Sequence, residues 1–113
     1  KVKDVFFEAE AMGAGKFDVG VWYGPASASE ALRGTVVDQD FFASDIDAAS
    51  AVAKARVVAE GGFYTVNERV LPLWLALGLS ADPLGHFDII ATVHTTAVTT
   101  GAARIGTEVL YVM

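Results

Sequence analysis

The fold is decided by residues 72 to 113, which contain Pro72-Leu-Trp-Leu-Ala-Leu-Gly78, Phe87-Asp-Ile-Ile-Ala-Thr-Val-His94 and Ile105-Gly-Thr-Glu-Val-Leu-Tyr111. In the last two runs one face collects most of the apolar side chains at every second position, which is the pattern of a β-strand. The short connection at Thr99-Thr-Gly-Ala-Ala103 predicts that these strands form a hairpin. Both faces of the hairpin carry apolar residues, which indicates a central position in a sandwich or an edge covered by a neighbouring subunit.

The first of the three runs predicts a short helical segment over residues 72 to 77. Pro72 suits the first turn of a helix, and Gly78 suits the position after its last residue. The segment is apolar, so we expect it to be mostly buried, with Trp74 as its anchor in the core.

Alternation also organises the N-terminal part of the chain. Two alternating runs, 5 to 11 and 17 to 23, flank Gly13-Ala-Gly15, which predicts a second hairpin. Shorter strands are expected at 32 to 37 and 53 to 59, with a helical turn or loop near 47 to 52. The sequence therefore predicts a mainly β fold, a compact sandwich or barrel-like domain with one or two short helices, in which residues 1–113 form a single domain.

Composition restricts the partners. The net charge is −6 and the eight basic residues are scattered, so we expect no nucleic acid partner. The chain has no cysteine, which excludes disulfides and thiol chemistry. The longest apolar run, 70 to 79, is about half of the roughly 20 residues that span a bilayer, so no membrane partner is expected. No hydrophobic stretch follows the N-terminal lysines, and no secretory signal is expected.

No arrangement of side chains predicts a reaction. None of the serines lies in a Gly-x-Ser-x-Gly context, and the glycine clusters match no nucleotide-binding fingerprint. His86 and Asp88 share a strand face and offer two metal ligands, but His94 is too far along the strand to join them. We therefore expect a protein that is not an enzyme, with no catalytic residue, no cofactor and no bound metal.

Four aromatic residues fall on or near faces that the alternation assigns to solvent: Phe6, Trp22, Phe41 and Phe42. Such residues can cap the core, form a subunit contact or stack on sugar rings. Acidic residues flank Phe41-Phe42, as they would rim an apolar patch, so the contact interpretation is favoured there. All four are interface candidates.

Several short motifs resemble small structural proteins of tailed bacteriophage particles, of the capsid decoration or cement type. They are Gly-Phe-Tyr-x-Val-Asn-Glu-Arg (62 to 69), Pro-Leu-Trp-x-x-Leu-Gly-Leu-x-x-Asp-Pro (72 to 83), Phe-Asp-Ile-x-x-Thr (87 to 92), Thr-Thr-Gly (99 to 101) and Tyr-Val (111 to 112). The resemblance covers about half of the chain. It implies a β-sandwich-like domain that binds the major capsid protein on the outer surface of the virion, commonly as a homotrimer, and stabilises the shell.

Two other functions remain open at this point. A phage tail or fibre component is the alternative within the virion. A carbohydrate-binding module that uses Trp22, Tyr23 and acidic side chains of one sheet face is the alternative from another class.

Overall fold

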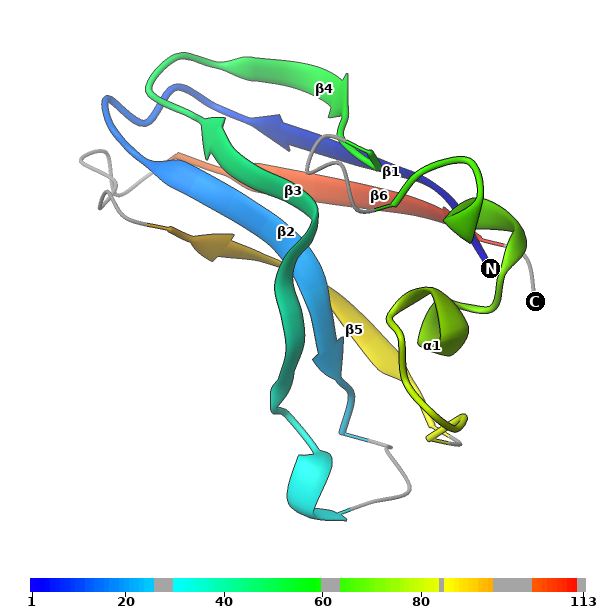
Figure 1. The fold of residues 1–113 in the computed structure, drawn as a ribbon. Helices are drawn as coiled ribbons and strands as arrows, with labels where there is room; N and C mark the ends of the chain where they lie inside the picture. The colour runs from blue at the N-terminus through cyan, green and yellow to red at the C-terminus, as the bar shows by residue number, and fades with distance from the viewer. Residues whose placement is uncertain (26–29, 60–63, 84, 95–102, 112–113) are drawn as a thin grey trace.

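A computed structural model describes residues 1–25, 30–59, 64–83, 85–94 and 103–111. The described part is mainly β, as predicted, with short helical turns between the strands (Figure 1). The elements are β1 (Val2–Ala9), β2 (Lys16–Tyr23), the 3-10 turn η1 (Glu30–Leu32), β3 (Val36–Asp47), β4 (Val52–Arg56), the 3-10 turn η2 (Glu68–Val70), α1 (Leu73–Ala76), β5 (Phe87–Val93) and β6 (Ile105–Tyr111).

The strands form two antiparallel sheets, with the orders β4-β1-β6 and β3-β2-β5. The two sheets face each other as a sandwich-like fold, in which the rings of Phe7 on β1 and Phe17 on β2 lie 5.5 Å apart (Figure 1). Both predicted hairpins are wrong, because β1 and β2 belong to different sheets, and so do β5 and β6. Alternation shows which face of a strand is apolar, but it does not encode which strand becomes its neighbour.

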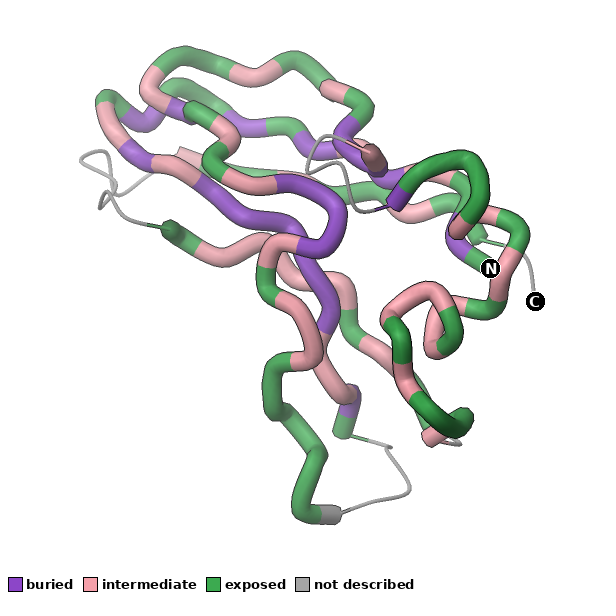
Figure 2. Tube along the Cα trace, in the orientation of Figure 1, coloured by how far each residue is buried: buried purple, intermediate pink, exposed green. Residues whose placement is uncertain are grey.

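The hydrophobic core lies between the sheets and is concentrated on β1, β2, the middle of β3 and the chain after β4 (Figure 2). Its fully buried side chains include Val5, Phe7, Val19, Val21 and Phe42. Each such side chain contributes about 1.5–3 kcal/mol when it leaves water. The strands β5 and β6 contribute only partly buried residues, so among the described residues the core is least filled on the side where these two strands lie.

A wide bulge in β3 changes the alternation of that strand. Val21 pairs with Asp38 and Val19 pairs with Ala43, so residues 39 to 42 of β3 stand opposite Gly20 alone. The consecutive residues Phe41 and Phe42 are both buried as a result. The prediction that they form an exposed contact patch is therefore wrong, because the bulge turns both rings into the core.

The buried rings of β3 pack around Tyr64. The ring centroids of Phe41 and Phe42 lie 5.4 and 5.1 Å from that of Tyr64, and the hydroxyl of Tyr64 donates a 2.6 Å hydrogen bond to the carbonyl of Val2. Edge-to-face contacts of this kind add about 0.5–1.5 kcal/mol per pair beyond area burial. Tyr64 therefore ties the chain after β4 to the start of β1.

The predicted helical segment is confirmed, although its anchor is different. Helix α1 begins after Pro72, and Gly78 follows it with a φ of 78°, a conformation that favours glycine. Trp74 is only half-buried, and the segment packs on the core through Leu73, Ala76 and Leu77. The expectation that Trp74 anchors the core is wrong, since a four-residue helix on the surface turns only some of its side chains inward.

We predict that Tyr64→Phe lowers the free energy of unfolding by about 1 kcal/mol at neutral pH, because the carbonyl of Val2 loses its partner. Burial raises the pKa of the Tyr64 phenol. The stability that depends on the neutral phenol is therefore present below the unfolded pKa of about 10 and is lost as the pH rises through the folded pKa. Urea unfolding between pH 7 and 11 should show a steeper loss for the wild type than for Tyr64→Phe. Tyr111→Phe, which changes an exposed tyrosine, is the control. Equal slopes of unfolding free energy against pH for all three proteins would contradict the prediction.

Candidate functional site

Asp18 is the one charged side chain that is buried among the residues that the structure describes. Its neighbours on β2, Phe17 and Val19, point into the core, so Asp18 points to the outer face of the β3-β2-β5 sheet. An aspartate on that face would normally meet solvent. Its exposure is only 2% because the bulged strand β3 covers it.

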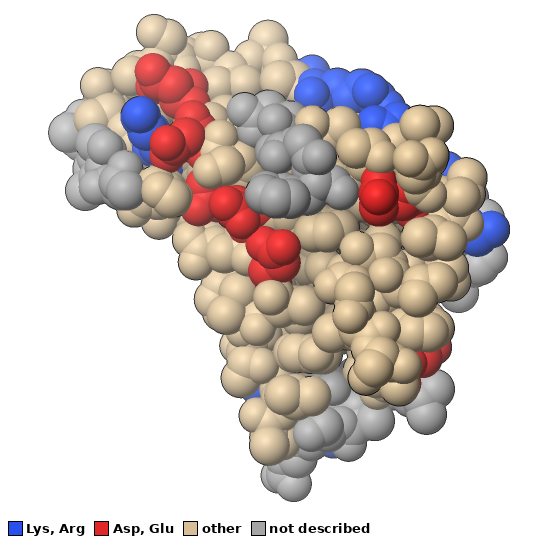
Figure 3. Space-filling view, in the orientation of Figure 1, with Lys and Arg blue, Asp and Glu red and all other residues tan. Residues whose placement is uncertain are grey.

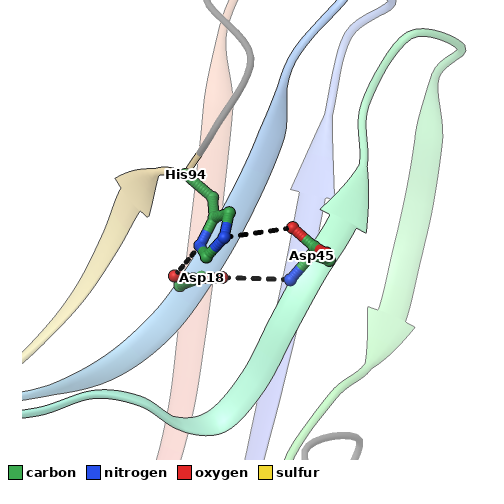
Figure 4. Close-up of side chains that lie close together, drawn as sticks. All are labelled: Asp18, Asp45 and His94. Carbon is green, nitrogen blue, oxygen red and sulfur yellow. Dashed lines mark hydrogen bonds and ion pairs between the residues drawn. The ribbon is translucent and has the colours of Figure 1, made fainter.

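Three donors satisfy the Asp18 carboxylate, and Figure 4 shows the two that come from Asp45 and His94. The backbone N–H of Asp45 donates to Oδ1 over 3.0 Å, and the side-chain amide of Gln39 donates to Oδ2 over 3.2 Å. The ring Nδ1 of His94 lies 2.5 Å from the same Oδ2. The carboxylate thus joins β2 to β3 and to the residue that follows β5.

A second bulge in β3 brings Asp45 to this carboxylate. Phe17 pairs with Ile46 and Val19 with Ala43, so residues 44 and 45 together oppose Asp18. Asp45 has a φ of 58°, a left-handed conformation that aspartate tolerates better than most residues. This backbone turn directs the N–H of Asp45 at Asp18 and leaves the Asp45 side chain exposed beside it.

The sheet register brings His94 to the same place. Thr92 of β5 pairs with Asp18, so His94 lies diagonally across from Asp18 on the same face. The backbone N–H of His94 donates a 2.7 Å hydrogen bond to the carbonyl of Lys16, which fixes the backbone from which the imidazole side chain extends. The second ring nitrogen, Nε2, faces Asp45 Oδ1 at 3.6 Å (Figure 4).

The electrostatics of the site follow from these contacts. Burial opposes ionisation of Asp18, but its hydrogen bonds to Asp45, His94 and Gln39 outweigh burial and hold its pKa below the usual range. The hydrogen bond to Asp18 raises the pKa of His94, and the charges of Asp18, Asp45 and Asp40 act in the same direction. Burial raises the pKa of Asp38, and the neighbouring Asp40 adds to that effect. The imidazole therefore lies in a strongly negative environment.

The structure does not bring together the histidines weighed from the sequence. His86 lies at the other end of β5, where its carbonyl accepts the N–H of Gly24, and Asp88 is exposed beside Trp22 on the sheet. The partners of His94 are Asp18 and Asp45 instead. Sequence reasoning missed this group because the contacts depend on a bulge in β3 and on the register of β2 with β5, although an aspartate between the core residues Phe17 and Val19 was a visible signal.

The remaining interface candidates lie on the outer faces of the sheets. Phe6 is half-buried, and the ammonium of Lys54 lies 5.1 Å from its ring centroid. Trp22 is also half-buried, and its indole Nε1 is enclosed without a hydrogen bond to a described residue. Neither ring forms an open platform, and their part in an interface stays a prediction.

An apolar groove opens between the sheets on the side of β5 and β6. It has a volume of about 750 Å³. Its apolar lining comes from β1, α1, β5 and β6 and includes Val2, Leu73, Ile89, Val109 and Tyr111. The groove lies where the core is least filled.

Comparison of the chain with protein-family models, with characterised proteins and with solved structures gives no match. Within the described ranges, no helix combines the length and the hydrophobicity that crossing a membrane requires.

Proposed function

We propose that this chain is a structural protein of a bacteriophage virion, of the decoration or cement type, which binds the outer surface of the capsid. The observation that carries the proposal is the open apolar side of the sandwich. A surface of this kind is suited to contact with another protein. The motif resemblance described from the sequence supports the same function.

The edge strands support this assignment. In the described structure β6 pairs only with β1 and β5 pairs only with β2, so each has an edge of unpaired backbone groups. Leu110 is 49% exposed and Tyr111 64% exposed on β6, and Val93 and Ile105 are exposed as well. Natural sheets usually protect such edges with charge or with a covering element. Here a neighbouring subunit would supply the cover.

The charges on and just before β6 do not protect its edge, because Glu108 and Arg104 are both paired with residues of the same side of the fold. Lys54 on β4 lies 3.1 Å from Glu108, and Arg104, just before β6, lies 2.9 Å from Glu10. These ion pairs offset the charges of Glu108 and Arg104 themselves. The edge strand therefore presents its apolar residues without a strong net charge.

The segment from Val66 to the end of α1 adds a second apolar surface next to the groove. Val66, Val70 and Leu75 are exposed there, while Leu73 of the same segment lines the groove. A subunit that contacts both surfaces would bury more apolar area than one that contacts an edge strand alone. Many copies on one shell would then bind firmly even if each contact is modest.

We further propose that the chain forms a homotrimer and that it binds the major capsid protein. The chain is acidic, with a net charge of −6, and this charge suits a protein on the outside of a shell filled with DNA. Acidic side chains are prominent on the face shown in Figure 3.

We predict that the double variant Leu110→Lys/Tyr111→Lys abolishes self-association, because it places two charges on the apolar edge. Sedimentation equilibrium should show a trimer for the wild type and a monomer for the variant. Ala53→Lys adds a charge to an exposed site on the opposite edge strand β4 and should leave the trimer intact. A wild-type chain that stays monomeric at high concentration would remove the self-association part of the proposal.

A further inference from the structure

We propose that His94 and Asp45 bind a divalent transition-metal ion, with zinc as the best match, and that the buried Asp18 orients the imidazole for this ion. The proposal rests on a mixed set of one imidazole and one carboxylate, backed by a second, buried carboxylate (Figure 4). It is independent of the proposed capsid function, and either one can fail without the other.

The separation of the two ligand atoms fits one metal ion. His94 Nε2 and Asp45 Oδ1 are 3.6 Å apart, beyond the usual hydrogen-bond range of about 2.7–3.2 Å. Zinc lies about 2.0–2.2 Å from imidazole nitrogen and carboxylate oxygen, so two ligands of one tetrahedral ion lie about 3.4 Å apart. A small movement of the exposed Asp45 side chain brings His94 Nε2 and Asp45 Oδ1 within bonding distance of the same ion.

The buried carboxylate orients the imidazole. Asp18 Oδ2 accepts the proton on Nδ1 of His94, which leaves the lone pair of the neutral ring on Nε2. Histidines that bind metals almost always donate their other N–H to a carboxylate or a carbonyl, and this partner fixes the ring and makes it a better ligand. Asp18 itself is held by Asp45 and Gln39, so the imidazole is fixed before any ion arrives.

The site is open to solvent and negative. The His94 side chain is 32% exposed and faces Asp45, which is also exposed. Asp18, Asp45 and Asp40 act electrostatically on His94. The negative charges of these three carboxylates outnumber the single positive charge of a protonated imidazole, so the group attracts cations. Two protein ligands leave the other positions to water, which predicts an exchangeable ion and not a permanent structural one.

The test is a titration of the full chain with Zn²⁺ at pH 8 by isothermal calorimetry. One ion should bind per chain, and His94→Gln and Asp45→Asn should each weaken the affinity at least tenfold. Asp18→Asn should weaken it about 10- to 100-fold, as removal of an outer partner of a metal-bound histidine does. His86→Gln is the matched control, because His86 is the other histidine of the chain.

A spectroscopic readout separates metal binding from a structural role. Zn²⁺ should shift the ¹⁵N resonance of His94 Nε2 and leave the resonances of His86 unchanged. Zn²⁺ should also raise the unfolding temperature of the wild type but not of Asp45→Asn, which keeps the backbone N–H that Asp18 uses. The proposal is overturned if no ion binds, if binding survives both His94→Gln and Asp45→Asn, or if it is lost with His86→Gln.

Discussion

Replacement of Gly20 by alanine is expected to lower the free energy of unfolding by more than about 3 kcal/mol, or to prevent folding. A Cβ at Gly20 would lie 2.1 Å from the carbonyl oxygen of Gln39 and 2.2 Å from that of Asp38. Both atoms belong to the backbone of the bulge in β3, which cannot move away as the end of a side chain can. The same bulge buries Phe41 and Phe42, so its displacement would also open the core.

Urea unfolding followed by circular dichroism measures this effect. Gly106→Ala is the matched control, since its Cβ would meet only the flexible carboxylate of Glu8, at 3.0 Å. We expect Gly106→Ala to stay within about 1 kcal/mol of the wild type. If the two variants are equally stable, the close approach of β3 to Gly20 is not a feature of the native fold.

Asp18→Ala should be the second most damaging change, with a loss of roughly 3 kcal/mol. The substitution removes the acceptor for the Asp45 N–H, the Gln39 amide and the His94 ring at once. The Asp45 N–H loses the carboxylate oxygen to which it donates over 3.0 Å. The loss should appear at neutral pH, where the lowered pKa keeps Asp18 ionised.

The same urea experiment tests this prediction. Asp88→Ala removes an exposed aspartate from the neighbouring strand β5 and should change the stability by no more than about 0.5 kcal/mol. An Asp18→Ala protein as stable as Asp88→Ala would show that the carboxylate does not hold β3 and His94 together.

Most element positions could be predicted from this sequence, because alternation and turn residues are local signals. The strand expected at 32 to 37 is wrong, since a 3-10 turn occupies Glu30–Leu32 and β3 runs over Val36–Asp47. The strand expected at 53 to 59 is found as Val52–Arg56, and the helix expected at 72 to 77 is found as Leu73–Ala76. Strand pairing could not be predicted in the same way. The connection between β1 and β2 carries glycines as a hairpin turn does, yet it leads the chain from one sheet to the other.

The candidate site was beyond sequence reasoning for a physical reason. Alternation assumes that each residue of a strand has one partner, and the register shifts between β2 and β3 break that assumption. The bulge opposite Gly20 turns Phe41 and Phe42 inward, and the bulge opposite Asp18 brings Asp45 to a carboxylate 27 residues away. His94 reaches the same carboxylate across 76 residues. Only the register of the folded sheet places these side chains together.

The copy number of this chain in purified particles tests the proposal that it decorates a phage capsid. Quantitative mass spectrometry across a density gradient of phage particles from a lysate that contains this chain would compare its abundance with that of the major capsid protein. We expect near-equal copy numbers in the head fraction. A few copies per particle, as a tail component would show, or absence from the particles would contradict it.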